Sequence, residues 1–248
     1  MFRTSSIDSF FYDQLNSSVI SDENIHKEIM EKFLCQSCIE NLSAKISLPI
    51  CHKCGILIPE KKRICDACSN YPPAFRISRS WGIYGHLLQE LIHLYKYSGK
   101  IQLSKPFGVL LFLCFIQNWE LNDIDIIAPV PLHKKRFRYR GFNQSYLLVK
   151  NWSLISEKLG IDISHIKIEK KALTRIRNTK PQITMDKHNR EKNVKDAFSV
   201  TDPDQIKGKK ILIIDDVFTT GSTANECAKV LLQNKAQYVD VLTLARVT

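Results

Sequence analysis

The chain has 248 residues, 44% of them hydrophobic, and a formal net charge of +11. That hydrophobic content is enough for a packed core and excludes a globally disordered protein, and the length suits one ordinary domain with a smaller one beside it. Residues 1–34 show no basic and apolar leader, and the longest apolar run, Val109 to Ile116, is shorter than the about 20 residues that cross a bilayer, so we expect a cytoplasmic protein.

Three regions of different character follow one another along the chain. Residues 1–34 form an N-terminal extension that we expect to be partly helical or disordered, because apolar residues recur at helical spacing only near its end. Residues 35–75 contain three C-x-x-C pairs and close on a Tyr-Pro-Pro turn. Residues 76–248 have the pattern of an α/β domain.

The spacing of two cysteine pairs predicts a structural zinc site in a small ribbon. Ten residues separate Cys51-x-x-Cys54 from Cys65-x-x-Cys68, and each pair can sit on a tight turn that directs two thiolates at one tetrahedral ion. Zinc would stabilise a segment that is too short to bury a core of its own. The alternative is a set of reduced surface cysteines, which would seldom pair so regularly.

The third pair, Cys35 and Cys38, leaves several assignments open. It can replace the last pair as ligands across a gap of twelve residues, it can recruit His26 or His52, or it can be a remnant of another site.

The remaining predicted elements alternate between strands and helices. Apolar patterns predict strands over residues 77–84, 124–130, 211–214 and 238–245, and helices over 86–97, 105–118, 146–159 and from Ser222 onward. We expect an extended segment over 163–173. A long basic polar stretch from 174 to about 195 can be a lid over a bound anion. Such alternation predicts a parallel sheet flanked by helices.

The most specific motif follows the third of these strands. Asp215 and Asp216 come directly after the apolar run and can accept hydrogen bonds from ribose hydroxyls or bind Mg²⁺ through water. A turn and a helix start then offer hydroxyls and free N–H groups to a phosphate. A P-loop is excluded, because the acids precede the glycine and no Gly-Lys-Ser/Thr follows. The bland alternative is an acidic turn in any α/β protein. The turn residues are Thr219, Thr220, Gly221, Ser222 (the predicted N-cap) and Thr223.

Positive charge is concentrated between Pro131 and Lys195, where 17 Lys and Arg residues outnumber 5 Asp and Glu, a local excess of +12. Arginine forks bind phosphate or pyrophosphate, and arginines interleaved with aromatic residues in a basic loop also suit a single-stranded nucleic acid. A solvated basic surface is the alternative to both. The candidate contacts are Arg136, Arg138, Arg140, Gly141, Asn143, Gln144, Arg175 and Arg177.

These motifs, in this order, resemble those of the ComF family of competence-associated proteins, in which a cysteine ribbon precedes a type I phosphoribosyltransferase-like domain. Many members have four cysteine pairs and two zinc sites. This chain lacks the first pair, which leaves Cys35 and Cys38 without partners. The resemblance covers residues 35–248. It rests on the three cysteine pairs, Leu91 to Tyr97 with Lys96, Pro129 to Leu132, Arg136, Arg140 to Ser145, Thr174 and Arg175 with Gln182, Arg190, Asn193 and Val194 with Ala197 and Phe198, and Asp215 to Thr223.

The resemblance implies a cytoplasmic bacterial protein that assists natural transformation. It would act on incoming single-stranded DNA, bind phosphoribosyl pyrophosphate (PRPP) or a related sugar phosphate with Mg²⁺, and work with other proteins of the DNA-uptake machinery. A second interpretation is an active phosphoribosyltransferase of nucleotide metabolism, with Asp215 and Asp216 as catalytic residues. A third is a zinc-ribbon interaction module with an inactive phosphate pocket. We favour the first, because few residues follow the last predicted strand and we expect no C-terminal hood for a nucleobase.

Overall fold

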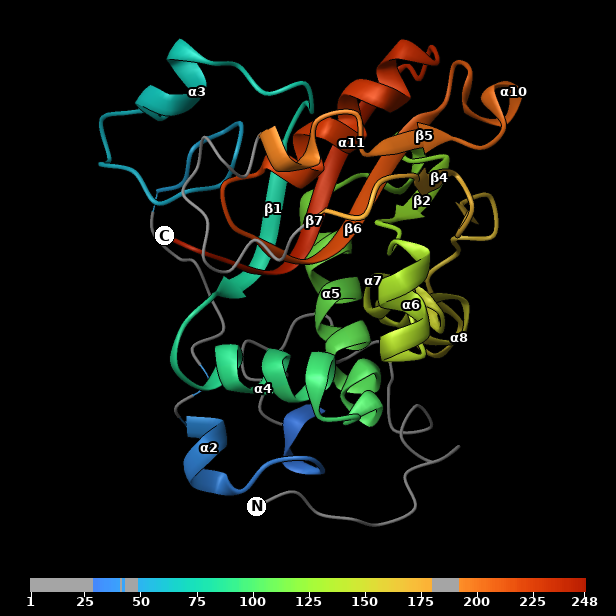
Figure 1. The fold of residues 1–248 in the computed structure, drawn as a ribbon. Coiled ribbons are helices and arrows are strands. Elements are labelled where there is room, and N and C mark those ends of the chain that lie inside the picture. Colours follow the sequence, from blue (N-terminus) through green and yellow to red (C-terminus); the bar gives the residue numbers. More distant parts are fainter. Residues whose placement is uncertain (1–28, 41, 43–48, 180–191) are drawn as a thin grey trace.

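The structure is a computed structural model that describes residues 29–40, 42, 49–179 and 192–248 (Figure 1). Its strands are β1 Ser78–Ile83, β2 Ile126–Pro129, β3 Lys167–Ile168, β4 Leu173–Arg175, β5 Phe198–Val200, β6 Lys210–Phe218 and β7 Tyr238–Arg246. Five of them form one parallel sheet in the order β1–β7–β6–β2–β3, and β4 pairs with β5 in antiparallel fashion. The predicted α/β class with a parallel sheet flanked by helices is confirmed.

Helices cover both faces of this sheet (Figure 1). Leu212 and Ile214 of β6 belong to one hydrophobic cluster, and Ile211 and Ile213 belong to another, because successive side chains of a strand point to opposite faces. The helices are α2 Gln36–Glu40, α3 Asp66–Asn70, α4 His86–Tyr97, η3 Ile101–Leu103, α5 Ser104–Asn118, η4 Leu121–Asp123, α6 Lys134–Arg140, α7 Gln144–Val149, α8 Trp152–Lys158, α10 Pro203–Ile206 and α11 Ser222–Gln233. On the sheet, α5 packs on β1 and β7, α7 on β6, and α11 on β6 and β7.

The apolar helix α5 lies in the core of the first cluster. A side chain at Gly108 would place its Cβ 2.8 Å from the carbonyl oxygen of Leu148, so the absence of a side chain lets α5 and α7 approach closely. The stretch Ile101–Asn118 is long and apolar enough by composition to cross a membrane, and 61% of it is buried inside the fold. Core helices of globular domains pass the same test, so the stretch is weak evidence for a membrane span.

Three predicted elements differ from the structure. The helix expected over 146–159 is divided into α7 and α8 at Lys150 and Asn151. The basic segment expected as a loop contains the helix α6, which begins after His133 and ends at Gly141, whose φ is 82°. Strand β6 continues past Ile214 to Phe218, so the two acids lie within the strand instead of after it.

The end of the N-terminal extension packs against the main core. Ile29, Met30 and Phe33 are buried in the same hydrophobic cluster as Leu91 and Ile92 of α4. Residues 1–28 lie outside the described part of the chain.

Candidate functional site

A cavity of about 390 Å³ lies at the carboxyl ends of β2 and β6. Ligands of open parallel sheets bind at this edge, and the cavity brings together parts that are far apart in the sequence. Its lining includes His93, Lys96 and Tyr97 of α4; Arg136, Tyr139 and Arg140 of α6; Gln144, Arg175, Asp215 and Asp216; and Thr219, Gly221 and Thr223 of the turn.

Asp216 forms a buried ion pair with Lys96. The two side chains are 6% and 16% exposed, and Lys96 Nζ lies 2.7 Å from Asp216 Oδ1. Burial alone would lower the pKa of Lys96, but the attraction of Asp216 outweighs it and the pKa is raised, so the lysine keeps its charge. The second oxygen, Asp216 Oδ2, is buried without a hydrogen-bond partner among the described residues, which leaves it able to accept from a ligand.

Asp215 is held by two donors. Its Oδ1 accepts hydrogen bonds from Ser145 Oγ at 3.0 Å and from the backbone N–H of Asp216 at 2.9 Å. Burial, and then the neighbouring charge of Asp216, raises the pKa of Asp215 to about 7. Near neutral pH this carboxyl is therefore poised between its neutral and ionised forms, and a nearby cation would favour the ionised form.

The turn after β6 places the N-terminus of α11 at the cavity. Gly221, with φ 78°, is the N-cap of α11 and provides no side-chain cap. The predicted N-cap, Ser222, already lies in the helix, and its Oγ is 2.7 Å from Thr220 Oγ1. The N–H of Ser222 donates to Thr220 Oγ1 at 3.4 Å, and the N-cap position carries no side chain that would cover the start of α11, which suits an anion site.

Helix α6 divides the predicted arginines into two groups. Arg136 and Arg140 are four residues apart, so they share a helix face, and both line the cavity, whereas Arg138 is exposed and does not. Arg140 Nη1 donates to Gln144 Oε1 at 2.7 Å, and its guanidinium lies 5.1 Å from the ring centroid of Tyr97. The alternation of arginines and aromatic residues thus does not place all three arginines in one site.

Asn143 and Gly141 shape the backbone near the cavity and are not among its lining residues. Asn143 Oδ1 accepts from the N–H of Ser145 at 3.0 Å and caps α7, while its Nδ2 donates to the carbonyl of Val130 at 3.1 Å. Asn143 thereby holds Ser145, the partner of Asp215, in place.

The two arginines of the later basic stretch also differ. Arg175 is buried, lines the cavity and lies over the ring of Phe198. Arg177 is exposed and donates to the carbonyl of Asn193 at 3.2 Å, away from the cavity lining. Residues 180–191, which include Gln182, Arg190 and most of the expected lid, lie outside the described residues.

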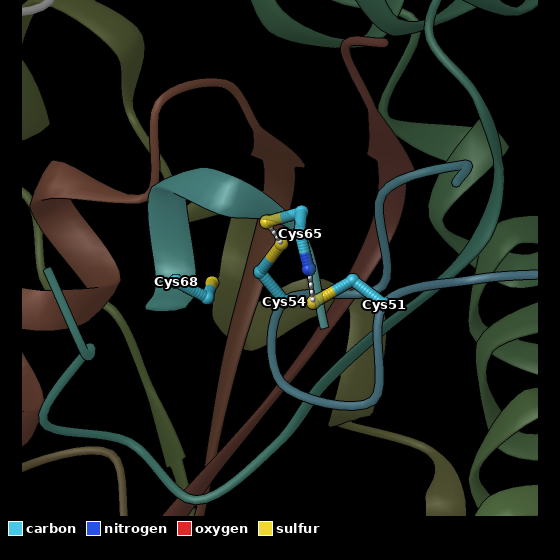
Figure 2. Close-up of side chains that lie close together, drawn as sticks. All are labelled: Cys51, Cys54, Cys65 and Cys68. Carbon is cyan, nitrogen blue, oxygen red and sulfur yellow. Dashed lines mark hydrogen bonds between the residues drawn. The ribbon is translucent and has the colours of Figure 1, made fainter. Parts of the chain in front are cut away.

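The four predicted zinc ligands form one cluster (Figure 2). Their sulfur atoms all lie within 4.8 Å of one another, and the sulfurs of Cys54 and Cys65 are 3.8 Å apart. Two sulfurs bound to one tetrahedral zinc at 2.3 Å would be about 3.8 Å apart. A structural metal such as zinc therefore fits Cys51, Cys54, Cys65 and Cys68.

Cys35 and Cys38 do not belong to this cluster in the described structure. Cys38 lies in α2, which Figure 1 places beside α4, at the end of the molecule opposite α3. The described residues thus do not bring this pair to the other four sulfurs.

Two residues of the site received no role from sequence reasoning: Lys96 and Ser145. Lys96 stood only among the motif residues, because a lysine in the last turn of a helix usually faces solvent near the helix dipole. Its spacing could have indicated a role: Lys96 follows the apolar Ile92 by four residues and therefore shares the buried face of α4, where a lysine needs a partner of opposite charge.

No protein-family model matches the chain. A DNA utilization protein YhgH of Escherichia coli K12 is 32% identical over 216 residues, which cover 86% of this chain and 90% of that protein. The chain belongs to the ComF family. Competence protein F of Haemophilus influenzae is also a member and is 28% identical, over 90% of this chain and 93% of that protein. Competence protein ComFC of Bacillus subtilis is 28% identical as well, over 86% of this chain and 84% of that protein.

Among solved structures, one titled "Structure of the allosteric regulatory enzyme of purine biosynthesis" aligns with this ComF protein at a TM-score of 0.33 and 19% identity, over 55% of this chain and 24% of its own.

Proposed function

We propose that this ComF protein assists the uptake and use of single-stranded DNA and that its cavity binds PRPP or a related sugar phosphate. One observation carries the proposal: a single cavity joins two carboxylates of β6, the N-terminus of α11 with glycine at its N-cap, and inward arginines. These are the groups that ribose hydroxyls, a phosphate and a diphosphate need.

Each group has a distinct role in this assignment. The turn from Thr219 to Thr223 binds the ribose 5-phosphate, and Asp215 and Asp216 accept hydrogen bonds from the ribose hydroxyls. Arg136 and Arg140 bind the diphosphate. Mg²⁺ suits the same carboxylates, because Asp216 Oδ2 is a buried acceptor without a partner among the described residues; when bound, the ion offsets the charge of the diphosphate.

The outer face of α6 is the surface that we propose for single-stranded DNA. It carries exposed basic and aromatic side chains, which neutralise phosphates and stack on bases without sequence preference. Phe137 is 48% exposed and Tyr139 is 90% exposed. The names of the relatives, competence and DNA utilization proteins, support a DNA-related role. The face comprises Lys134, Lys135, Phe137 and Arg138, and Tyr139 lies where this face meets the rim of the cavity.

The test is a titration of a labelled single-stranded oligonucleotide at several salt concentrations, with and without PRPP and Mg²⁺. We expect affinity to fall with salt with a slope of about −0.7 per phosphate contacted. PRPP with Mg²⁺ should raise the Tm of the wild type but not of Asp215→Ala/Asp216→Ala. Absence of salt-sensitive DNA binding would refute the DNA role, and equal Tm shifts would refute the assignment of the acids.

A second candidate, an active phosphoribosyltransferase, is favoured by the rim of the cavity. Tyr97 and Tyr139 are exposed there. These rings of α4 and α6 form an aromatic surface on which a nucleobase acceptor can stack, a role that we expected only a separate hood segment to fill. In that reaction a base nitrogen attacks the ribose C1 and pyrophosphate leaves. Pyrophosphate release from PRPP that depends on an added nucleobase would support catalysis.

A further inference from the structure

Arg246, in β7, is a buried cation without a carboxylate partner among the residues that the structure describes. It is 2% exposed, and none of the described Asp or Glu residues forms an ion pair with it. Its Nη1 donates a hydrogen bond to the carbonyl oxygen of Cys54, and its Nε is buried without a partner in the described part of the chain. A buried charge is costly unless an opposite charge lies close to it, so an anion is needed near Arg246.

The four-cysteine cluster supplies such an anion when zinc binds. Cysteines bound to zinc are thiolates, so four of them around Zn²⁺ carry a net charge of about −2. The loop of the first cysteine pair presses against Arg246: a Cβ on Gly55 would lie 3.5 Å from Arg246 Nη1 and 2.7 Å from the carbonyl oxygen of Ser78. With φ 74° at Gly55, only glycine fits this approach.

The same arginine contacts the residue that supports the phosphate turn. Its guanidinium lies 4.7 Å from the ring centroid of Phe218, its register partner on β6. The ring of Phe218 fills the space beside Gly221, where an added Cβ would lie only 2.5 Å from the ring carbon Cζ. The ring of Phe218 therefore contacts both the charge of Arg246 and the turn that faces the cavity.

We propose that Arg246 is the buried counter-charge of the four-cysteine centre, and that Phe218 transmits the occupancy of that centre to the phosphate turn. The second half rests on the proposed function of the turn. In this arrangement zinc fixes Arg246, Arg246 fixes the ring of Phe218, and the ring holds Gly221 in the conformation that exposes the helix N-terminus.

The counter-charge is tested by zinc affinity, measured in competition with a chromophoric chelator. Arg246→Gln keeps an N–H donor but removes the charge, and we expect zinc to bind at least tenfold more weakly. Arg246→Lys keeps the charge and should lose less than threefold. Arg79→Gln is the matched control, because Arg79 also donates to a carbonyl of the same loop, that of His52 at 3.1 Å, but is only partly buried; its loss should also stay below threefold.

The stability of the metal-free protein distinguishes a counter-charge role of Arg246 from a purely packing role. An uncompensated buried charge destabilises the metal-free protein, so metal-free Arg246→Gln should be at least as stable as metal-free wild type. Lower stability of the metal-free variant, or unchanged zinc affinity, would overturn the proposal.

Transmission is tested by hydrogen exchange of the amides of residues 219–223, with and without zinc. In the wild type, removal of zinc should accelerate exchange severalfold. In Phe218→Leu, which keeps the cysteines and Arg246, exchange should be fast in both states. Equal wild-type exchange with and without zinc would overturn transmission. Neither measurement uses PRPP, so these results stand apart from any failure of PRPP to bind.

Discussion

Lys96 and Asp216 join α4 to the carboxyl end of β6 through a buried ion pair of 2.7 Å. The pair fixes the helix that forms one wall of the cavity to the strand that carries both acids. Because Asp215 lies beside it, one cation and two carboxyls share a single buried site. Burial, and then the charge of Asp216, raises the pKa of Asp215, whereas burial lowers the pKa of Lys96 and the attraction of Asp216 raises it overall.

Removal of the lysine should destabilise the fold. Lys96→Met leaves Asp216 buried and unpaired, and we expect the free energy of unfolding in denaturant to fall by about 3–5 kcal/mol. Lys134→Met, at an exposed position of α6, should change it by less than about 0.5 kcal/mol. Lys96→Met/Asp216→Asn should regain much of the loss, and a single variant as stable as the Lys134 control would contradict this account.

The raised pKa of Asp215 predicts a defined pH dependence. The folded-state pKa of about 7 exceeds the ordinary value of 3.8, so the folded state holds the proton more tightly than the unfolded state. The stability contribution of Asp215 is therefore lost as pH rises from about 4 to about 7. Asp215→Asn lacks this loss, and its Tm relative to wild type should rise across that window and then level off. A constant difference from pH 4.5 to pH 8.5 would show that the carboxyl titrates normally.

The arginines of α6 should separate into two functions. Arg136→Ala/Arg140→Ala should weaken PRPP binding in calorimetry by about tenfold or more, because each lost charge-assisted hydrogen bond costs about 1.5–3 kcal/mol. Lys134→Ala/Arg138→Ala should leave PRPP affinity unchanged and reduce the magnitude of the DNA salt slope by about 1.4, for two lost phosphate contacts. If the inward pair flattens the salt slope instead, the DNA surface extends into the cavity.

Gly221→Ala should destabilise the protein by more than the strain of a positive φ alone would cause. Gly208 offers the control, since its φ of 72° is also positive but nothing lies within 4 Å of an added Cβ. Gly208→Ala should cost about 1 kcal/mol of stability from backbone strain. Gly221→Ala should cost more and weaken PRPP binding as well, because the methyl group displaces Phe218. Equal Tm losses in the two variants would show that the ring yields freely.

Local signals explain what could be predicted from the sequence. The apolar run from Ile211, the acids and the glycine turn lie within 13 residues, so their order alone placed a strand, a site and a helix. The cysteine spacing was equally local. The Lys96–Asp216 pair joins residues 120 positions apart, and no local pattern links them.

The placement of the three arginines on different sides of α6 could not be predicted, for a different physical reason. Alternating arginines and aromatic residues have the period of an extended chain, but His133 and Gly141 delimit a helix, in which positions 136 and 140 share a face and 138 does not. The inward and outward arginines could be told apart only once the backbone was known.

The order of strands in the sheet sets the sequence of assembly. Strand β7 lies between β1 and β6, so Ser78 finds its register partner only at Val241. Such distant pairing makes folding slow, because a long loop must close before the contacts form. During synthesis, β1 cannot pair until β7 has been synthesised. A nascent chain that already contains both acids and the phosphate turn still lacks β7, the strand that pairs with β6 beside them. The ability to bind a ligand should therefore arise in one late step.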